Sequence, residues 1–308
     1  MPRFSASDAA LEGFRITKEN PRAFGAWVLA SFGMSVLGAV VTVLMPAEVR
    51  HGLETLSADE TPDPKQFLDA LIVVAPILAL GLAIQCIMAA AVYRLILRHD
   101  DTRFRYLRLG ADELRLIGLT LIYVVLIIAL LVVVSLVAAV LMAIASIAGT
   151  GAAFFVGGVA EIFSLGLVVF ILVRLSLAPV VTFAERRIAV FESWRLTRGH
   201  FWSLLGAYAL ALACIALIGI LALAVFTGVA GIAALATGGQ LSDLSAIFKP
   251  DETSFRSYFN PGLLAYMAVG SLFSALYYAV IAAPGAVAYR QLHGTPPDAP
   301  LAAQTEAG

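Results

Sequence analysis

Long apolar stretches alternate with shorter polar connections along the whole chain. A helix needs about 20 apolar residues to cross a hydrocarbon core of roughly 30 Å, and six stretches meet that length. Several are longer, which predicts tilt or helix ends that project beyond the lipid. The stretches run over residues 24–44, 67–97, 114–147, 152–183, 201–236 and 262–292. Pro76 and Pro284 lie inside two of them and predict kinks. The pattern predicts an all-α fold, a polytopic membrane helix bundle with six transmembrane helices.

Composition supports lipid as the solvent of this chain. Hydrophobic residues make up 61% of the sequence and charged residues 13%, with a mean hydropathy of +0.93. Soluble domains carry roughly 25% charged residues. A soluble enzyme is therefore excluded.

The basic residues predict the orientation of the bundle. Most of the 20 lysines and arginines fall in the N-terminal segment, in the second and fourth connections, and at the C-terminus. The other connections hold the remaining basic residues and an acidic cluster: Arg50, Lys65, Lys249 and Arg256, with Glu48, Glu54, Asp59, Glu60 and Asp63. The positive-inside rule then places both termini in the cytoplasm of a multi-pass protein of the bacterial inner (plasma) membrane. Trp27, Trp194 and Trp202 fall on the basic side, where tryptophans anchor helices at the interface.

Short amphipathic segments precede the first, third and fifth stretches. Their apolar positions stand at helical spacing beside arginines: Leu11 and Phe14, then Phe104 and Leu107, then Ile188, Phe191 and Trp194. Each predicts a short helix in the cytoplasmic headgroup region. Ser5 and Asp8 fit a capping box that opens the first.

These segments suggest three amphipathic-helix-plus-hairpin repeats, over about 7–94, 100–174 and 187–290. Phe14-Arg15, Leu107-Arg108 and Trp194-Arg195 begin the units, and Tyr93-Arg94, Val173-Arg174 and Tyr289-Arg290 end them. The units would be related by an axis along the membrane normal. The alternative is that inner-membrane proteins in general place arginine and aromatic residues at cytoplasmic helix ends. We expect one membrane domain over 1–293 and a disordered cytoplasmic tail over 294–308.

The sequence shows no catalytic constellation. The four histidines are scattered, and there is no HExxH, GxSxG, Walker or GxGxxG motif. We expect no enzyme activity, no cofactor, no metal site and no nucleic-acid partner. Arginines beside amphipathic aromatics attract anionic lipid, at about 1 kcal/mol per basic residue near the surface. The candidate headgroup contacts are Arg186, Arg187, Arg195, Arg198, Arg105 and Arg108. The alternative is that these arginines only orient the helices.

Two charges lie within the fourth apolar stretch. Glu161 and Arg174 are candidate intramembrane functional residues, because charges in the hydrocarbon region are costly. They lie about 20 Å apart along one helix, so they cannot pair directly. The alternatives are that Arg174 extends to the cytoplasmic interface and that Glu161 lies near the outer surface.

Residues 177–206 resemble the polytopic membrane domain attached to some glycerophosphoryl diester phosphodiesterases, and its stand-alone relatives. The similar features are an apolar segment with proline, the motif Ser193-Trp-Arg-Leu-Thr-Arg-Gly199, and an aromatic entry to the next helix. No soluble phosphodiesterase domain follows residue 293, so no catalytic residue carries over. The resemblance implies a lipid-associated or envelope role.

The sequence favours a non-enzymatic membrane protein that contacts lipid, a membrane-protein partner or a second copy through its cytoplasmic collar. The alternative is a small transporter or channel with a path between the repeats. Only Glu161, Gln85 and some hydroxyl groups would line such a path. A membrane-embedded lipid enzyme would need a pair of carboxylates or histidines, which the sequence lacks.

Overall fold

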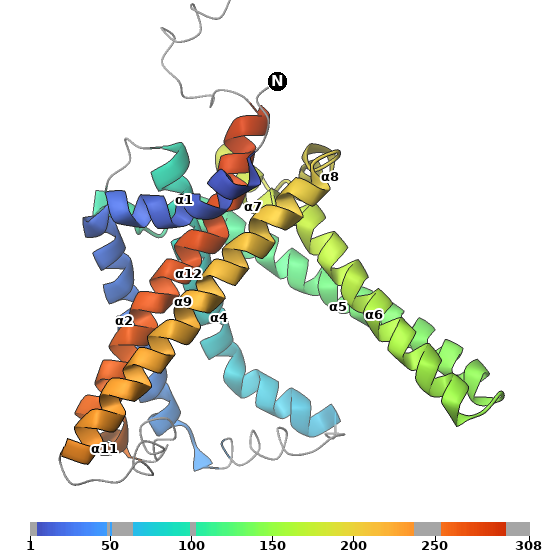
Figure 1. The fold of residues 1–308 in the computed structure, drawn as a ribbon, viewed down its shortest axis with the longest axis horizontal. Coiled ribbons are helices and arrows are strands. Elements are labelled where there is room, and N and C mark those ends of the chain that lie inside the picture. The colour runs from blue at the N-terminus through green and yellow to red at the C-terminus, as the bar shows by residue number, and fades with distance from the viewer. Residues whose placement is uncertain (1–4, 48–49, 51–63, 99–102, 237–253, 294–308) are drawn as a thin grey trace, which may run out of the picture.

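The computed structural model describes residues 5–47, 50, 64–98, 103–236 and 254–293, and every element within them is helical (Figure 1). Six helices are long and apolar enough to cross a membrane, which confirms the predicted fold class. The acidic residues of segment 51–63 and the tail 294–308 lie outside the described residues. The elements are α1 (Ala6–Glu19), α2 (Pro21–Leu44), α4 (Pro64–Leu97), η1 (Arg103–Tyr106), α5 (Ala111–Ser146), α6 (Thr150–Leu175), α7 (Ala178–Glu185), α8 (Val190–Leu196), α9 (Phe201–Ala236), α11 (Phe255–Tyr258) and α12 (Pro261–His293).

Helix α12 is the centre of the bundle. It packs against α1, α2, α4 and α9. Ala275, Ala279, Ala283 and Ala286 recur along α12 and are fully buried. Small side chains at this spacing let neighbouring backbones approach closely, which is how helices pack where lipid removes the hydrophobic driving force.

The hairpin of α5 and α6 forms an arm that projects from the bundle (Figure 1). The two helices pack against each other, while the outer part of the arm stands away from α9 and α12. Large apolar side chains such as Leu136, Phe154 and Ile162 are exposed there. Lipid is the natural solvent for such a surface.

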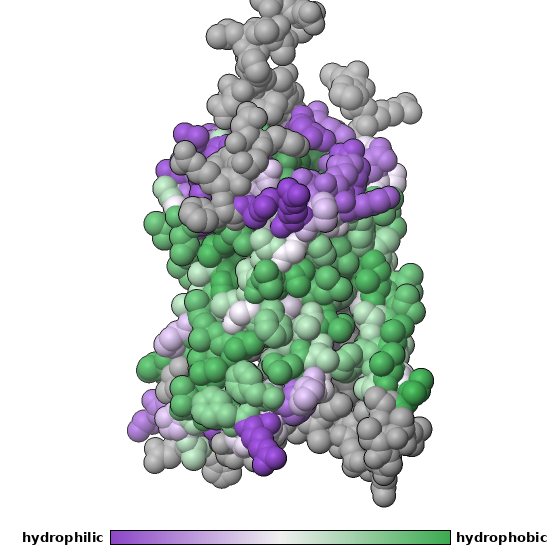
Figure 2. All heavy atoms as spheres, turned by 90° about the vertical axis from the view of Figure 1, so that its left-hand side faces the viewer, coloured by the Kyte–Doolittle hydropathy of each residue, from purple (hydrophilic) through white to green (hydrophobic). Residues whose placement is uncertain are grey.

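One end of the molecule gathers most of the arginines, and we call it the basic end. The N-termini of α2, α5 and α9 lie there with the C-termini of α4 and α12 (Figure 1). Figure 2 shows a hydrophilic band at this end above a broad hydrophobic girdle. Hydrophilic residues also appear at the opposite end, as expected for a chain that crosses a membrane.

The fourth apolar stretch is two helices rather than one. Helix α6 ends at Leu175, and α7 begins at Ala178 with a proline in its first turn. Leu177, Val180 and Phe183 are fully buried, because α7 packs among α4, α5 and α12. Because the residues on both sides of this break are mostly apolar, the hydrophobic pattern did not predict it.

The amphipathic segments take different forms. Helix α1 forms where predicted and crosses α12, and the Ser5 hydroxyl accepts from the amide of Asp8 (3.4 Å). The segment around Phe104 is only one 3-10 turn, because Arg105 and Tyr106 have φ values of 56° and 72°. Helix α8 is a short helix before α9.

The threefold repeat stays a prediction. Helices α5 and α6 pack as a hairpin, as do α9 and α12. Helices α2 and α4, in contrast, contact α12 more than they contact each other over the described residues.

Candidate functional site

Arg174 lies in an aromatic cage where α6, α8 and α9 meet at the basic end. Its guanidinium carbon lies 5.3 Å from the ring centre of Phe170, 5.6 Å from that of Trp194 and 5.8 Å from that of Phe201. Each ring face attracts the cation. Nη1 donates to the Thr197 hydroxyl (3.5 Å), and Nε is buried without a partner. Within the described ranges, no carboxylate pairs with Arg174.

Ser193 holds this corner together. Its hydroxyl donates to the Arg174 carbonyl (2.7 Å) and accepts from the Leu177 amide (3.1 Å). Both backbone groups flank the break between α6 and α7, where the helical hydrogen-bond ladder is interrupted. Ser193 and Thr197 are fully buried. The two hydroxyls of the Ser193–Gly199 motif therefore join α8 to α6 and fix the position of Arg174.

An open depression of about 630 Å³ adjoins this cage. Its lining consists of Arg174, Phe191, Trp194, Arg195 and Arg198. Arg195 and Arg198 are exposed and, in the part of the chain that the structure describes, make no ion pair. Three guanidinium groups and no carboxylate line one surface, an arrangement that attracts an anion.

The neighbouring arginines of the same segment lie outside this depression. Arg187 pairs with Glu185 (2.6 Å) and with Glu192. Its hydrogen bond lowers the pKa of the Glu192 carboxyl below the ordinary value. Arg186 is exposed and ends α7 with φ 55°. Arg187 is therefore neutralised within the protein, whereas Arg174, Arg195 and Arg198 are not.

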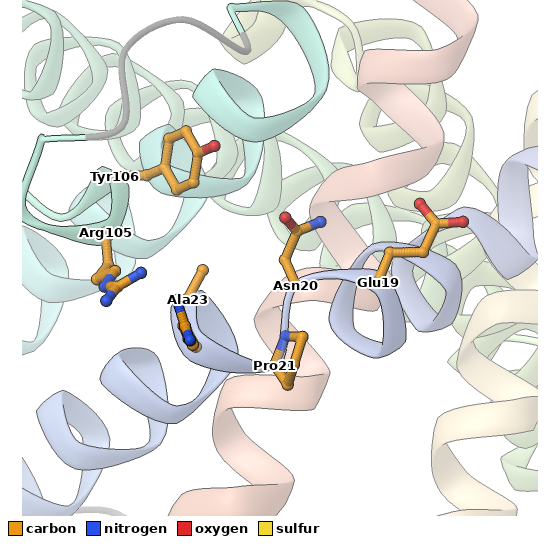
Figure 3. A pocket seen from close by; sticks show the side chains of 7 residues that line it. Glu19, Asn20, Pro21, Ala23, Arg105 and Tyr106 are labelled. Atoms are coloured by element: carbon orange, nitrogen blue, oxygen red, sulfur yellow. The ribbon is translucent and has the colours of Figure 1, made fainter.

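Arg105 lies in η1 and Arg108 in the connection between η1 and α5, apart from the first depression. Arg108 comes within 3.9 Å of Asp112, which also pairs with Arg115 (2.8 Å) and Arg98 (3.5 Å). Arg105 lines a second depression, of about 380 Å³, at the corner between α1 and α2 (Figure 3).

A buried ion pair supports the second depression, and the sequence did not lead us to predict it. Arg94 and Glu113 pair with both side chains fully buried. Arg94 also donates to the Tyr106 carbonyl (2.8 Å) and lies 5.6 Å from the ring centre of Phe183. The sequence did offer a sign of this pair, because Asp112 and Glu113 stand between the arginine-rich connection and the third apolar stretch.

Trp27 is a core residue and not an interfacial anchor. Only 1% of its surface is exposed, and its indole N–H donates to the Arg105 carbonyl (3.2 Å). Trp194 and Trp202 are exposed.

Glu161 is exposed on the α5–α6 arm, so it is not a buried carboxylate. Gln85 is also exposed, on α4. The two predicted intramembrane residues, Glu161 and Arg174, are not brought together. Among the described residues, no group of three or more His, Cys, Asp or Glu side chains could hold a metal ion.

Comparisons with family models, with curated proteins and with solved structures found no match for this chain.

Proposed function

We propose that this chain is a bacterial inner-membrane protein that binds anionic phospholipid headgroups at its basic end, without a catalytic step. The basic end and both termini face the cytoplasm in this proposal. The observation that carries it is the depression in which Arg174, Arg195 and Arg198 converge without a carboxylate in the described structure.

The surroundings of these arginines fit a lipid better than a soluble anion. Phe191, which lines the depression, and Trp202, whose ring packs against Phe201 of the cage, are each 78% exposed. Such side chains lie in the acyl boundary while arginines meet phosphate oxygens above it. The planar guanidinium binds phosphate through two parallel hydrogen bonds. At about 1 kcal/mol for each basic residue, three arginines give a measurable preference for anionic lipid.

The resemblance of residues 177–206 to the polytopic membrane domain attached to some glycerophosphoryl diester phosphodiesterases implies a lipid-associated or envelope role, and that role agrees with this proposal. That stretch supplies Trp194, Arg195 and Arg198 to the depression, and Ser193 and Thr197 to its support.

Native mass spectrometry of the detergent-extracted protein tests the proposal. The variant Arg174→Gln/Arg195→Gln/Arg198→Gln should lose a phosphatidylglycerol or cardiolipin molecule that the wild type retains. The control Arg186→Gln/Arg187→Gln/Arg290→Gln removes the same charge outside the depression and should retain that lipid. Equal retention by the two variants would show that the arginines only orient the helices.

A further inference from the structure

The second depression lies between the α1–α2 corner and η1. Glu19, Asn20, Pro21, Arg22, Ala23, Arg105 and Tyr106 line it. Arg22 and Arg105 are exposed, and neither forms an ion pair over the ranges that the structure describes. Glu19 is the one carboxylate of the lining, and Figure 3 shows it directed away from Arg105. The depression therefore carries a net positive charge.

The backbone that presents Arg105 is strained. Arg105 and Tyr106 both have left-handed φ values, 56° and 72°, which residues with a Cβ adopt at a cost. Such strain persists only where the surroundings enforce it, and it concentrates at functional positions.

Two buried donors enforce this conformation. Trp27 Nε1 donates to the Arg105 carbonyl (3.2 Å), and Arg94 Nη1 donates to the Tyr106 carbonyl (2.8 Å). Both side chains are almost fully buried, and the Arg94 guanidinium is held in turn by Glu113. The backbone at Arg105 is therefore held in place by buried side chains, so binding of a ligand costs little further backbone entropy.

We infer that this depression is a second anion-binding site, in which Arg22 and Arg105 bind one phosphate group, and that Trp27 and the Arg94–Glu113 pair are its positioning residues. The phosphate is either a phosphodiester of a lipid headgroup or free inorganic phosphate. The two guanidinium groups and the one carboxylate, which is directed away from Arg105, leave a net charge of +1. This charge suits a phosphate group with a single negative charge. The site shares no residue with the depression at Arg174, so it does not depend on the function proposed above.

The full chain, reconstituted in phosphatidylcholine nanodiscs, tests this inference with two probes. Phosphatidylglycerol is added in one arm and inorganic phosphate in the other. Arg22→Gln/Arg105→Gln should weaken binding of the probe at this site about 30-fold. Arg186→Gln/Arg290→Gln, which removes two exposed arginines elsewhere, should leave it unchanged. If Arg22→Gln/Arg105→Gln loses binding of phosphatidylglycerol alone, the ligand is a lipid headgroup. If the variant loses the stabilisation against thermal unfolding that inorganic phosphate gives the wild type, the ligand is the free anion.

Trp27→Phe keeps an aromatic ring but removes the donor to the Arg105 carbonyl. It should weaken the same probe while binding at the Arg174 site is kept, which a general loss of stability would not produce. Equal binding of both probes by wild type and Arg22→Gln/Arg105→Gln would overturn the inference. Native mass spectrometry separates the two proposals: the double variant and the triple variant at Arg174 should each retain one bound molecule fewer than the wild type, and full retention by one variant overturns only the proposal for its own site.

Discussion

Taking the guanidinium of Arg94 and the carboxylate of Glu113 out of water costs several kcal/mol for each ion. Their mutual attraction, the Tyr106 carbonyl and the ring of Phe183 offset that cost. The compensation is incomplete, because Arg94 Nε and Glu113 Oε2 are buried without a partner in the described structure. The pair therefore contributes more to fixing α4 against α5 than to net stability.

Removing one partner of this pair should be costly. Glu113→Ala leaves the Arg94 charge buried and unpaired, and should lower the free energy of unfolding by about 3–5 kcal/mol. Arg94→Met/Glu113→Leu removes both charges and should lose less than Glu113→Ala alone. Thermal unfolding in detergent compares them, with Glu161→Ala as the exposed control. A Glu113→Ala protein as stable as the control would contradict this account.

Ser193 should matter for stability and for the arginine cage together. Ser193→Ala leaves the buried Leu177 amide without an acceptor, at a cost of about 1–3 kcal/mol. It also leaves the Arg174 carbonyl with only the longer bond from the Thr197 hydroxyl (3.5 Å), so retention of anionic lipid should fall with the melting temperature. Ser164→Ala is the matched control, since the Ser164 hydroxyl only donates to the Ala160 carbonyl of its own helix. The interpretation fails if the two variants melt together and retain equal lipid.

At the scale of elements, α1 is fixed to the bundle by one close crossing. A Cβ at Gly13 would lie 2.4 Å from the Cα of Val280 on α12, closer than any real contact. Ala9 and Ala10 of α1 are fully buried, so small residues line α1's closest approach to its neighbours, in the turn before Gly13 and at Gly13 itself. Helix α1 is therefore packed on helices α9 and α12, and its remaining residues are exposed or half-buried.

Gly13→Ala should push α1 away from α12 and destabilise the protein by about 1–3 kcal/mol. Gly25→Ala is the control, because nothing lies within 4 Å of its added methyl group. Alanine is favoured over glycine inside a helix, so the control should gain about 0.5–1 kcal/mol. Thermal unfolding of the two proteins gives the signs, and a stabilised Gly13→Ala would exclude the crossing.

The length and apolarity of the six stretches were enough to predict the membrane helices. Hydrophobic periodicity did not predict the break before Ala178, because Leu177 to Phe183 is apolar apart from Thr182 and becomes buried in the bundle. The available signal was Pro179, in the first turn of α7. Arg94 was interpreted from its position near a helix end, as a topology signal. Its pairing with Glu113 depends on how α4 packs against α5, and a single sequence does not determine that packing. For the same reason the sequence identified the arginines of the basic end, but not which of them are neutralised.

At the scale of the whole molecule, polar and apolar contacts are separated along the membrane axis. The described ion pairs and the aromatic cage gather at the basic end, while the small residues of α12 pack the span. Arginine–carbonyl bonds occur at both ends, from Arg94 and Arg98 at the basic end and from Arg50 at the other. The α5–α6 arm joins the rest mainly through contacts of α5 with α4 and α7 and of α6 with α8. Its exposed apolar surface is compatible with lipid and not with water. Both arginine-lined depressions therefore lie at the basic end, beside the apolar girdle.

The charge imbalance between the two ends predicts the orientation of the molecule, which can be measured directly. An even number of crossings places both termini on one side, and the positive-inside rule predicts that this side is the cytoplasm. A reporter fused after His293 should therefore be active only if it works in the cytoplasm, and a reporter inserted at Ala58 should show the opposite compartment. Opposite compartments at His293 and Ala58 would also support an odd number of crossings between them. A periplasmic His293 fusion would remove the cytoplasmic assignment, and with it the reason to expect the anionic inner leaflet at Arg174 and Arg105.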